Sequence, residues 1–288
     1  MPNQQHKPKA KFPALIYFGG LLVVSLFLYG MVFTKAYPAS ASLQSSQDEP
    51  VASTSETSSE STEPVKPAQE YSVYGEEDKK TIVLLDAGHG GMDGGNMTGE
   101  ILEKNINLDV TNKVAAYLQE LNPNIEVRMI RTNDETPWAV SELDDLNYRV
   151  DQQSAQNAEY FVSIHCNAYE DDPSVRGSVF FVNPNDEVMK GLASKITTNL
   201  QNINWSSSYQ TLDHETLQVV TMSPIHSMLI ELGYMTNPEE LAKLSSPEEQ
   251  DEVAKAIAGA ISDYIHDNPD APAFQNQIYP DGTATPAQ

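Results

Sequence analysis

The sequence has little cysteine and few basic residues. The single cysteine, Cys166, excludes any disulfide bond within the chain. Only 17 lysines and arginines stand against 41 aspartates and glutamates, which gives a formal net charge of −24. Because a protein that binds nucleic acid needs a basic surface to neutralise the phosphates, this composition argues against a nucleic-acid partner. A folded domain of this chain must rely on its hydrophobic core, with a bound metal as a further source of stability.

One long uncharged segment, residues 13–33, lies near the N-terminus. Three lysines precede it and one lysine, Lys35, closes it. The segment exceeds the apolar core of an ordinary signal peptide and fits a membrane-spanning helix, and its charge bias places the N-terminus inside the cell. The triplet at 39–41 (Ala-Ser-Ala) keeps a cleaved, secreted form open as the alternative. We therefore expect residues 1–35 to be a cytoplasmic stub and a single transmembrane anchor or signal, with the remaining chain outside the cytoplasm.

The composition divides the rest of the chain into three parts. Residues 36–80 are rich in Ser, Thr, Glu and Pro and cannot bury enough apolar surface to fold, so a disordered linker is predicted. Residues 268–288 have no periodic pattern and are predicted to be a disordered tail. Residues 81–267 lie between these segments and are long enough for one domain with a sizeable core.

Within residues 81–267, short apolar runs alternate with patterns of helical period, which predicts an α/β domain. We expect a single open, largely parallel sheet flanked by helices. The motif Asn-Pro-Glu-Glu from Asn237 and the motif Ser-Pro-Glu-Glu from Ser246 each predict a helix start. The predicted strands cover residues 82–85, 125–130, 160–165, 177–182 and 228–232, and the other predicted helices cover 103–121, 142–158 and 188–203.

Titratable residues lie near the ends of three predicted strands. His89 follows the first strand, His165 closes the third and Glu231 lies near the end of the last. Such strand ends converge on one edge of a parallel sheet, where ligands bind. Glu103 begins a helix 14 residues after His89. Two histidines and a carboxylate are the ligands of a catalytic zinc site, and a second carboxylate would act as general base. Sequence position alone does not decide which glutamate has which role.

Six stretches of residues 81–265 carry a family resemblance: VLLDAGHGGMDGG, the glutamate of ILEKNINL, VRMIRTND, NYRVDQQSAQNA, FVSIHCNA and LIELGYMTNPEE. In this order they resemble the zinc-dependent N-acetylmuramoyl-L-alanine amidases that share the amidase-3 catalytic domain. The resemblance implies one Zn²⁺ per chain, held by His89, Glu103 and His165, with Glu231 as the catalytic glutamate. It also implies an open α/β fold and peptidoglycan as the substrate, cleaved between N-acetylmuramic acid and L-alanine.

Two alternatives stay open beside this function. The chain could be a non-catalytic peptidoglycan-binding or regulatory protein on the same fold, or a zinc peptidase that acts on the stem peptide. One departure from the family concerns substrate contacts: many members have a leucine-arginine pair before the last strand, where this chain has Thr221 and Met222. The glycine-rich residues 88–95 lack the Lys-Ser/Thr of a phosphate-binding loop, so nucleotide binding is not supported.

The remaining reactive or charged residues are interpreted as structural. Cys166 directly follows one of the candidate histidines. Because adjacent strand residues point to opposite faces, the two do not form a nucleophilic dyad. Arg131 and Arg149 are expected to hold loops or pair with nearby acids. His214 and His226 are expected to have surface or loop roles.

Overall fold

The structure is a computed structural model that describes residues 69–77, 79–214 and 217–274. The predicted anchor, residues 1–35, and most of the predicted linker lie outside these ranges. In the described ranges, no helix combines the length and apolar character needed to cross a membrane.

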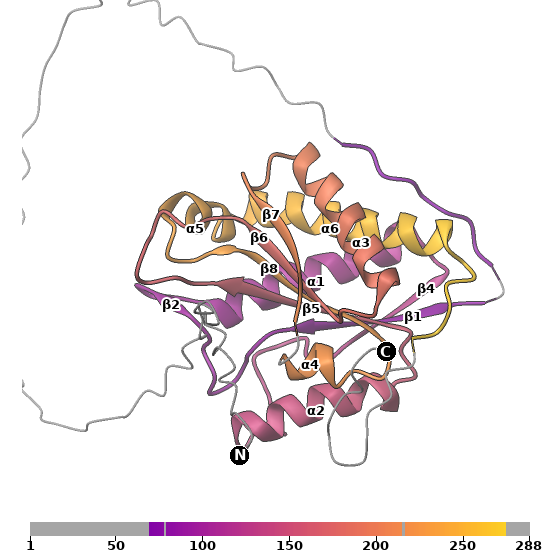
Figure 1. The fold of residues 1–288 in the computed structure, drawn as a ribbon, viewed down its shortest axis with the longest axis horizontal. Helices are drawn as coiled ribbons and strands as arrows, with labels where there is room; N and C mark the ends of the chain where they lie inside the picture. Colours follow the sequence, from indigo (N-terminus) through magenta and orange to yellow (C-terminus); the bar gives the residue numbers. More distant parts are fainter. Residues whose placement is uncertain (1–68, 78, 215–216, 275–288) are drawn as a thin grey trace, which may run out of the picture. The chain divides into compact units, whose positions relative to one another are not determined.

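A six-stranded sheet forms the centre of the described part (Figure 1). All neighbouring strands in it are parallel except one antiparallel pair, β6 with β8. This confirms the predicted largely parallel α/β sheet. In spatial order the strands are β4 (Ile125–Met129), β1 (Thr81–Ala87), β5 (Tyr160–Asn167), β8 (His226–Tyr234), β6 (Ser178–Val182) and β7 (Tyr209–Asp213).

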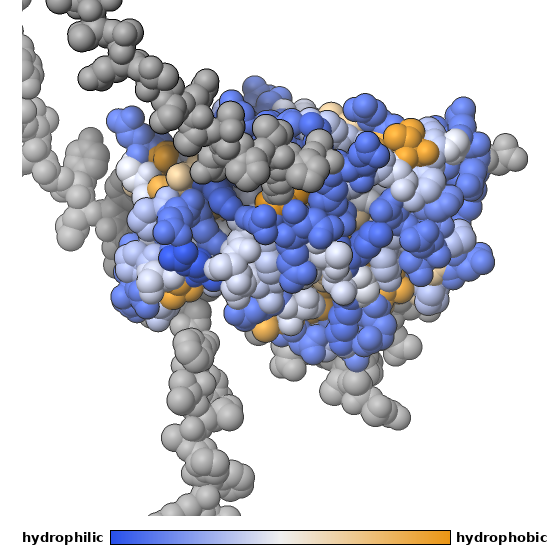
Figure 2. Space-filling view, turned by 90° about the horizontal axis from the view of Figure 1, so that it is seen from above, coloured by the Kyte–Doolittle hydropathy of each residue, from blue (hydrophilic) through white to orange (hydrophobic). Residues whose placement is uncertain are grey.

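Helices cover both faces of this sheet (Figure 1). One face packs against α1 (Glu103–Leu121), α3 (Glu187–Asn202) and α6 (Pro247–Asp267), and this layer holds the larger hydrophobic core. The other face packs against α2 (Glu142–Ala155) and α4 (Gln218–Thr221) through a smaller core. In the described residues seen in Figure 2, the surface is mostly hydrophilic with small, separate hydrophobic patches, as the acid-rich composition leads one to expect.

Both predicted helix starts are confirmed. The Asn237 side chain accepts hydrogen bonds from two backbone N–H groups of α5 (Pro238–Leu244), and the Ser246 side chain accepts one from Glu249 at the start of α6. These caps accept hydrogen bonds from N–H groups that have no partner inside the helix. Proline is tolerated at the first helical position because the N–H that it lacks would have no partner there. The cap chemistry thus sets where α5 and α6 begin after β8.

Some short elements were not predicted. They are the hairpin of β2 (Met97–Thr98) and β3 (Ile101–Leu102), the edge strand β7 and the single turn α4. Most side chains of β7 are exposed, so its sequence lacks the alternation of buried and exposed residues that predicts a strand. The strand is held by backbone hydrogen bonds to β6. His214 lies in the loop after β7, as predicted.

The folded part begins before residue 81. Tyr71 packs so closely on α6 that a Cβ at Gly259 would lie 2.2 Å from its ring. The Tyr74 hydroxyl donates a 2.8 Å hydrogen bond to Asp263, also on α6. Two aromatic side chains at the end of the predicted linker therefore find apolar and polar partners on the domain, and residues 71–74 belong to the folded part.

His226 is not a surface or loop residue, so that prediction is wrong. It begins β8 and is only 5% exposed. Its Nδ1 lies 2.9 Å from Asp186 Oδ1, its Nε2 lies 2.8 Å from the carbonyl oxygen of Pro272, and its ring stacks on Tyr160. The strand begins two residues earlier than predicted, because the polar pair His226-Ser227 finds hydrogen-bond partners inside the fold.

The buried pair of His226 and Asp186 makes stability depend on pH. Burial alone would lower the pKa of His226, but the hydrogen bond and charge of Asp186 outweigh it and raise the pKa above its ordinary value. The pair therefore stabilises the fold fully below about pH 6.5, the unfolded value, and the contribution is lost as pH rises through the higher folded-state pKa.

We expect His226→Gln to lower the melting temperature most at about pH 6, with the gap to the wild type narrowing as pH rises through the folded pKa. Differential scanning calorimetry of both proteins, from about pH 6 upward, measures the difference between their melting temperatures. Gln119→Ala, at an exposed position of α1, is the control and should show no gap that changes with pH. A gap for His226→Gln that stays constant with pH would contradict this account.

Candidate functional site

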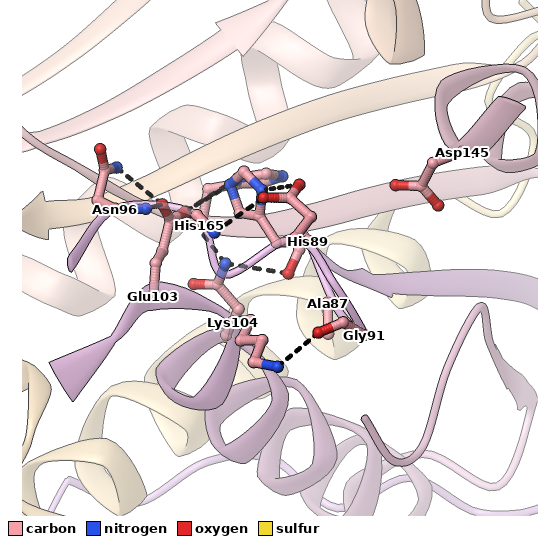
Figure 3. Close-up of polar contacts among 12 residues, drawn as sticks. Ala87, His89, Gly91, Asn96, Glu103, Lys104, Asp145 and His165 are labelled. Carbon is pink, nitrogen blue, oxygen red and sulfur yellow. Dashed lines mark hydrogen bonds and ion pairs between the residues drawn. The ribbon is translucent and has the colours of Figure 1, made fainter. Parts of the chain in front are cut away.

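Three of the predicted site residues lie together. His89 in the loop after β1, Glu103 at the first position of α1 and His165 near the end of β5 each offer one ligand atom, and these atoms lie within 4.8 Å of one another. Glu103 Oε1 lies 3.2 Å from His89 Nε2 and 3.1 Å from His165 Nδ1. Figure 3 shows the three side chains pointing toward one another. Residues far apart in sequence thus form one cluster, with Glu103 between the two histidines.

The charge of Glu103 dominates this cluster. Its side chain is 1% exposed, and burial alone would raise the pKa of its carboxyl group. The hydrogen bonds and charges of His165 and His89 outweigh burial and hold that pKa well below its ordinary value. Burial would likewise lower the pKa of His89, but Asp93 and Glu103 raise it to about 10. A buried carboxylate that stays ionised requires positive charge beside it, which protonated histidine supplies here.

A zinc ion fits this donor set. Two imidazole nitrogens and one carboxylate oxygen are the ligands of catalytic zinc sites that keep a fourth position open. A divalent cation would also satisfy the buried charge of Glu103 in place of the proton on His89, with release of that proton. Of the two glutamates left open by the sequence, Glu103 is therefore the one whose position suits a ligand.

Asp93 orients the His89 ring. Its Oδ2 lies 2.6 Å from His89 Nδ1, and its Oδ1 accepts a 3.0 Å hydrogen bond from the backbone N–H of Gly95. A carboxylate on one imidazole nitrogen fixes the tautomer and leaves the other nitrogen for a metal. Here the nitrogen left over is Nε2, which faces Glu103. Sequence analysis did not single out Asp93, although its place four residues after His89 in a glycine-rich loop was a usable signal.

Glu231 lies beside this cluster but is not part of it. It pairs in register with His165 across the parallel strands β5 and β8, so both side chains project from the same face of the sheet. Its Oε2 is buried and has no hydrogen-bond partner in the described ranges. Burial, followed by the charge of Glu103, raises the pKa of Glu231 to about 8, against a smaller opposing effect of His89. A carboxyl group with these properties is suited to proton transfer.

Arg149 holds the backbone of the histidine loop. His89 has a φ of 61°, a left-handed conformation that is unfavourable for a residue with a Cβ. Arg149, from α2, donates a 2.8 Å hydrogen bond to the His89 carbonyl oxygen and forms ion pairs with Asp86 and with Asp145. Its guanidinium is 3% exposed, and both carboxylates offset the cost of burying it. The prediction that Arg149 holds a loop and pairs with acids is confirmed.

Arg131 supports the preceding residues in the same way. Its Nε donates to the carbonyl oxygen of Ala87 at 2.8 Å, and one terminal nitrogen donates to Gly88 at 2.9 Å and to Lys104 at 2.8 Å. These bonds tie the end of β1 to the first turn of α1. The loop that carries His89 and the helix that carries Glu103 are therefore held at a fixed separation.

Two glycines let the backbone come close to the cluster. A Cβ at Gly88 would lie 2.1 Å from His165 Nε2, and a Cβ at Gly95 would lie 2.7 Å from Glu103 Oε2. Gly95 also has a φ of 65°, which favours glycine. At Gly94, between them, a Cβ would meet only Leu102 Cδ2 at an ordinary 3.4 Å. The glycine-rich loop is thus shaped by contact with the histidine and carboxylate side chains.

Cys166 is not suited to act as a nucleophile. Its side chain is 1% exposed and packs in the core on the α1 side of the sheet, and burial raises the pKa of its thiol well above the ordinary value. Its backbone N–H does contribute, with a 3.0 Å hydrogen bond to Glu103 Oε1. The interpretation of Cys166 as structural is confirmed.

Comparisons with known proteins point to one family. Residues 83–263 match the sequence model of the N-acetylmuramoyl-L-alanine amidases. The chain is 31% identical over 199 residues to the germination-specific N-acetylmuramoyl-L-alanine amidase of Bacillus subtilis (strain 168), a match that covers 66% of this chain and 82% of that protein.

Two solved structures are similar in fold and sequence. The CwlD amidase from Clostridioides difficile, in complex with the GerS lipoprotein, is 27% identical with a TM-score of 0.58 and covers 65% of this chain and 99% of its own. The catalytic domain of CwlV, an N-acetylmuramoyl-L-alanine amidase from Bacillus (Paenibacillus) polymyxa var. colistinus, is 26% identical with a TM-score of 0.56 and covers 65% of this chain and 98% of its own.

The glycine contacts yield a direct test of the cluster geometry. We expect Gly88→Ala to push the His165 ring away from Glu103, because the new methyl group would overlap that ring. The imidazole NMR resonances of His165 report this displacement. Gly94→Ala is the matched control in the same loop and should leave those resonances in place. Unchanged His165 resonances in Gly88→Ala would show that the ring and loop are not packed as described.

Proposed function

This chain belongs to the N-acetylmuramoyl-L-alanine amidase family, and on that premise we propose that it hydrolyses the amide bond between N-acetylmuramic acid and L-alanine in peptidoglycan. The observation that carries the proposal is the convergence of His89, Glu103 and His165 from three separate elements to within 4.8 Å. Two partly buried histidines and a buried carboxylate in this arrangement are suited to binding a metal ion, and the neighbouring Glu231 is suited to carrying a proton.

One zinc ion per chain would be held by His89, Glu103 and His165. When bound, zinc supplies a Lewis acid that polarises the amide carbonyl and makes water a stronger nucleophile at neutral pH. Around it, the residues of the chain keep the ligands in place: Asp93 orients the His89 ring, and Arg149 holds the carbonyl oxygen of the same residue. The cluster is thus arranged before any substrate arrives, which is what transition-state stabilisation requires.

Glu231 would act as general base and then as general acid. Its pKa, raised by burial to about 8, lets it carry a proton near neutral pH, and its buried Oε2 has no competing partner in the described part of the chain. In the reaction it takes the proton from the attacking water and delivers it to the leaving amide nitrogen of L-alanine. The positive charge of a bound metal would lower the pKa of Glu231, which favours the base form at the start of the cycle.

We further place the catalytic domain outside the cytoplasm, on the strength of the uncharged residues 13–33 and the lysine bias around them. The membrane would be a partner through this segment, and the polar linker predicted to follow residue 35 would extend the domain toward the wall. Membrane fractionation of cells that produce the full chain tests the attachment. In spheroplasts, we expect added protease to digest the catalytic domain; protection of the domain would contradict its placement outside the cytoplasm.

Digestion of purified peptidoglycan with the zinc-loaded full chain tests the reaction. Mass analysis is expected to find free stem peptides that begin with L-alanine, together with glycan strands that have lost them. Shortened peptides still attached to glycan would instead indicate a zinc peptidase. Binding without any product would indicate a non-catalytic wall-binding protein.

Variants separate the two roles within the site. Glu231→Gln should lower the hydrolysis rate by about 10²–10⁴-fold while keeping zinc, because it removes proton transfer only. His165→Ala should lose both zinc and hydrolysis, because it removes a ligand. Glu170→Gln, an exposed residue after β5, is the control and should keep both. Full zinc occupancy in His165→Ala, measured by atomic emission, would contradict the ligand assignment.

A further inference from the structure

Asn96, which lies directly before β2, contacts the buried carboxylate of Glu103 with both its backbone and its side chain. The backbone N–H of Asn96 donates to Glu103 Oε2 at 2.9 Å, and the side-chain Nδ2 donates to the same oxygen at 2.7 Å. Figure 3 shows this amide on the side of Glu103 away from the rest of the cluster. Oε2 therefore accepts two hydrogen bonds from one residue, while Oε1 faces the two histidines.

The Asn96 amide is itself fixed. Its Nδ2 carries two hydrogens, and the second is donated to the carbonyl oxygen of Cys166 at 3.0 Å. The backbone N–H of Cys166 donates to Glu103 Oε1. Asn96, Cys166 and Glu103 thus form a closed hydrogen-bonded set that joins the loop before β2, the end of β5 and the start of α1. Rotation of the Asn96 side chain would break both of its bonds, so the amide holds one orientation.

This set gives the two oxygens of Glu103 different surroundings. Oε1 is held by Cys166 and by the side-chain amide of Asn107, at 3.0 and 3.1 Å, and points toward the histidine nitrogens. Oε2 is occupied by Asn96. A free carboxylate can bind a metal ion through one oxygen or through both. Turning Oε2 toward the histidines would cost both of its hydrogen bonds to Asn96, at a carboxylate whose side chain is only 1% exposed.

We propose that Asn96 is a positioning residue that restricts Glu103 to metal binding through Oε1 alone. The inference rests on the metal site proposed above and adds to it the role of a residue outside the ligand set. A carboxylate limited to one oxygen takes one coordination position, which keeps a position open for water or the substrate carbonyl. Asn96 would therefore affect both metal affinity and the number of ligands, without touching substrate.

The side chain of Asn96 can be tested apart from its backbone. Asn96→Ala keeps the backbone N–H bond to Oε2 and removes only the amide. Asn96→Asp is nearly isosteric but puts a carboxylate against Glu103, so repulsion replaces a hydrogen bond. Asn105→Ala is the matched control, because Asn105 is an exposed asparagine on the first turns of α1.

Zinc affinity of the full chain, measured by competition with a chromogenic chelator, is expected to fall about 10- to 100-fold in Asn96→Ala, the range typical of residues that orient ligands. Asn96→Asp should bind more weakly still, and Asn105→Ala should match the wild type. The second measurement is the visible spectrum after loading with Co²⁺. Because Co²⁺ absorbs less strongly as ligands are added beyond four, Asn96→Ala should show weaker absorption per bound ion.

Each outcome decides between the proposals. If the wild type binds neither zinc nor cobalt, the metal site itself is wrong. If the wild type binds both and Asn96→Ala has the same affinity and spectrum, the metal site stands and the role of Asn96 is refuted. Weaker binding with an unchanged spectrum per bound ion would also refute it, since that result reflects a general loss of structure rather than a change in how Glu103 binds.

Discussion

The buried charge of Glu103 is the constraint on which the site depends. A carboxylate that is 1% exposed is costly unless positive or hydrogen-bonding groups surround it. Here two histidines lie against Oε1, which also accepts hydrogen bonds from Cys166 and Asn107. The side-chain amide of Asn96 donates to the other oxygen, Oε2. The same donors that surround this negative charge make up the proposed metal site. One set of contacts therefore offsets the cost of burying Glu103 and arranges the donor atoms of that proposed site.

The surrounding fold keeps this set in register. Strand β5 places His165 near the carboxyl end of the parallel strands, and pairing with β8 puts Glu231 directly beside it. Arg131 and Arg149, both nearly buried, bind the carbonyl oxygens of residues 87–89 and hold His89 in a left-handed conformation. These hydrogen bonds hold the loop that carries His89 in one backbone conformation. The arginines contribute through the loop backbone, whereas the groups proposed to take part in the reaction are histidine and glutamate side chains.

Much of the fold and the position of His89, His165 and Glu231 could be predicted, because strand ends converge on one edge of a parallel sheet. The pairing of Glu103 with the histidines needed the family resemblance, since a first-turn helix acid has a common structural explanation. The burial of His226 was not predicted, because the sequence does not show that Asp186, 40 residues away, is its buried hydrogen-bond partner. Asn96 was missed for a similar reason, because a polar residue in a glycine-rich loop resembles an ordinary turn former until its partners are known.

A crystal structure of the zinc-loaded protein, with anomalous diffraction data at the zinc absorption edge, would show directly how Glu103 binds the metal. We expect one strong anomalous peak, about 2.0–2.2 Å from one nitrogen of His89, one nitrogen of His165 and Oε1 of Glu103, with Oε2 still bound to Asn96. A peak elsewhere, or a zinc ion bound through both oxygens of Glu103, would contradict the central claim that one buried, oriented carboxylate organises the site.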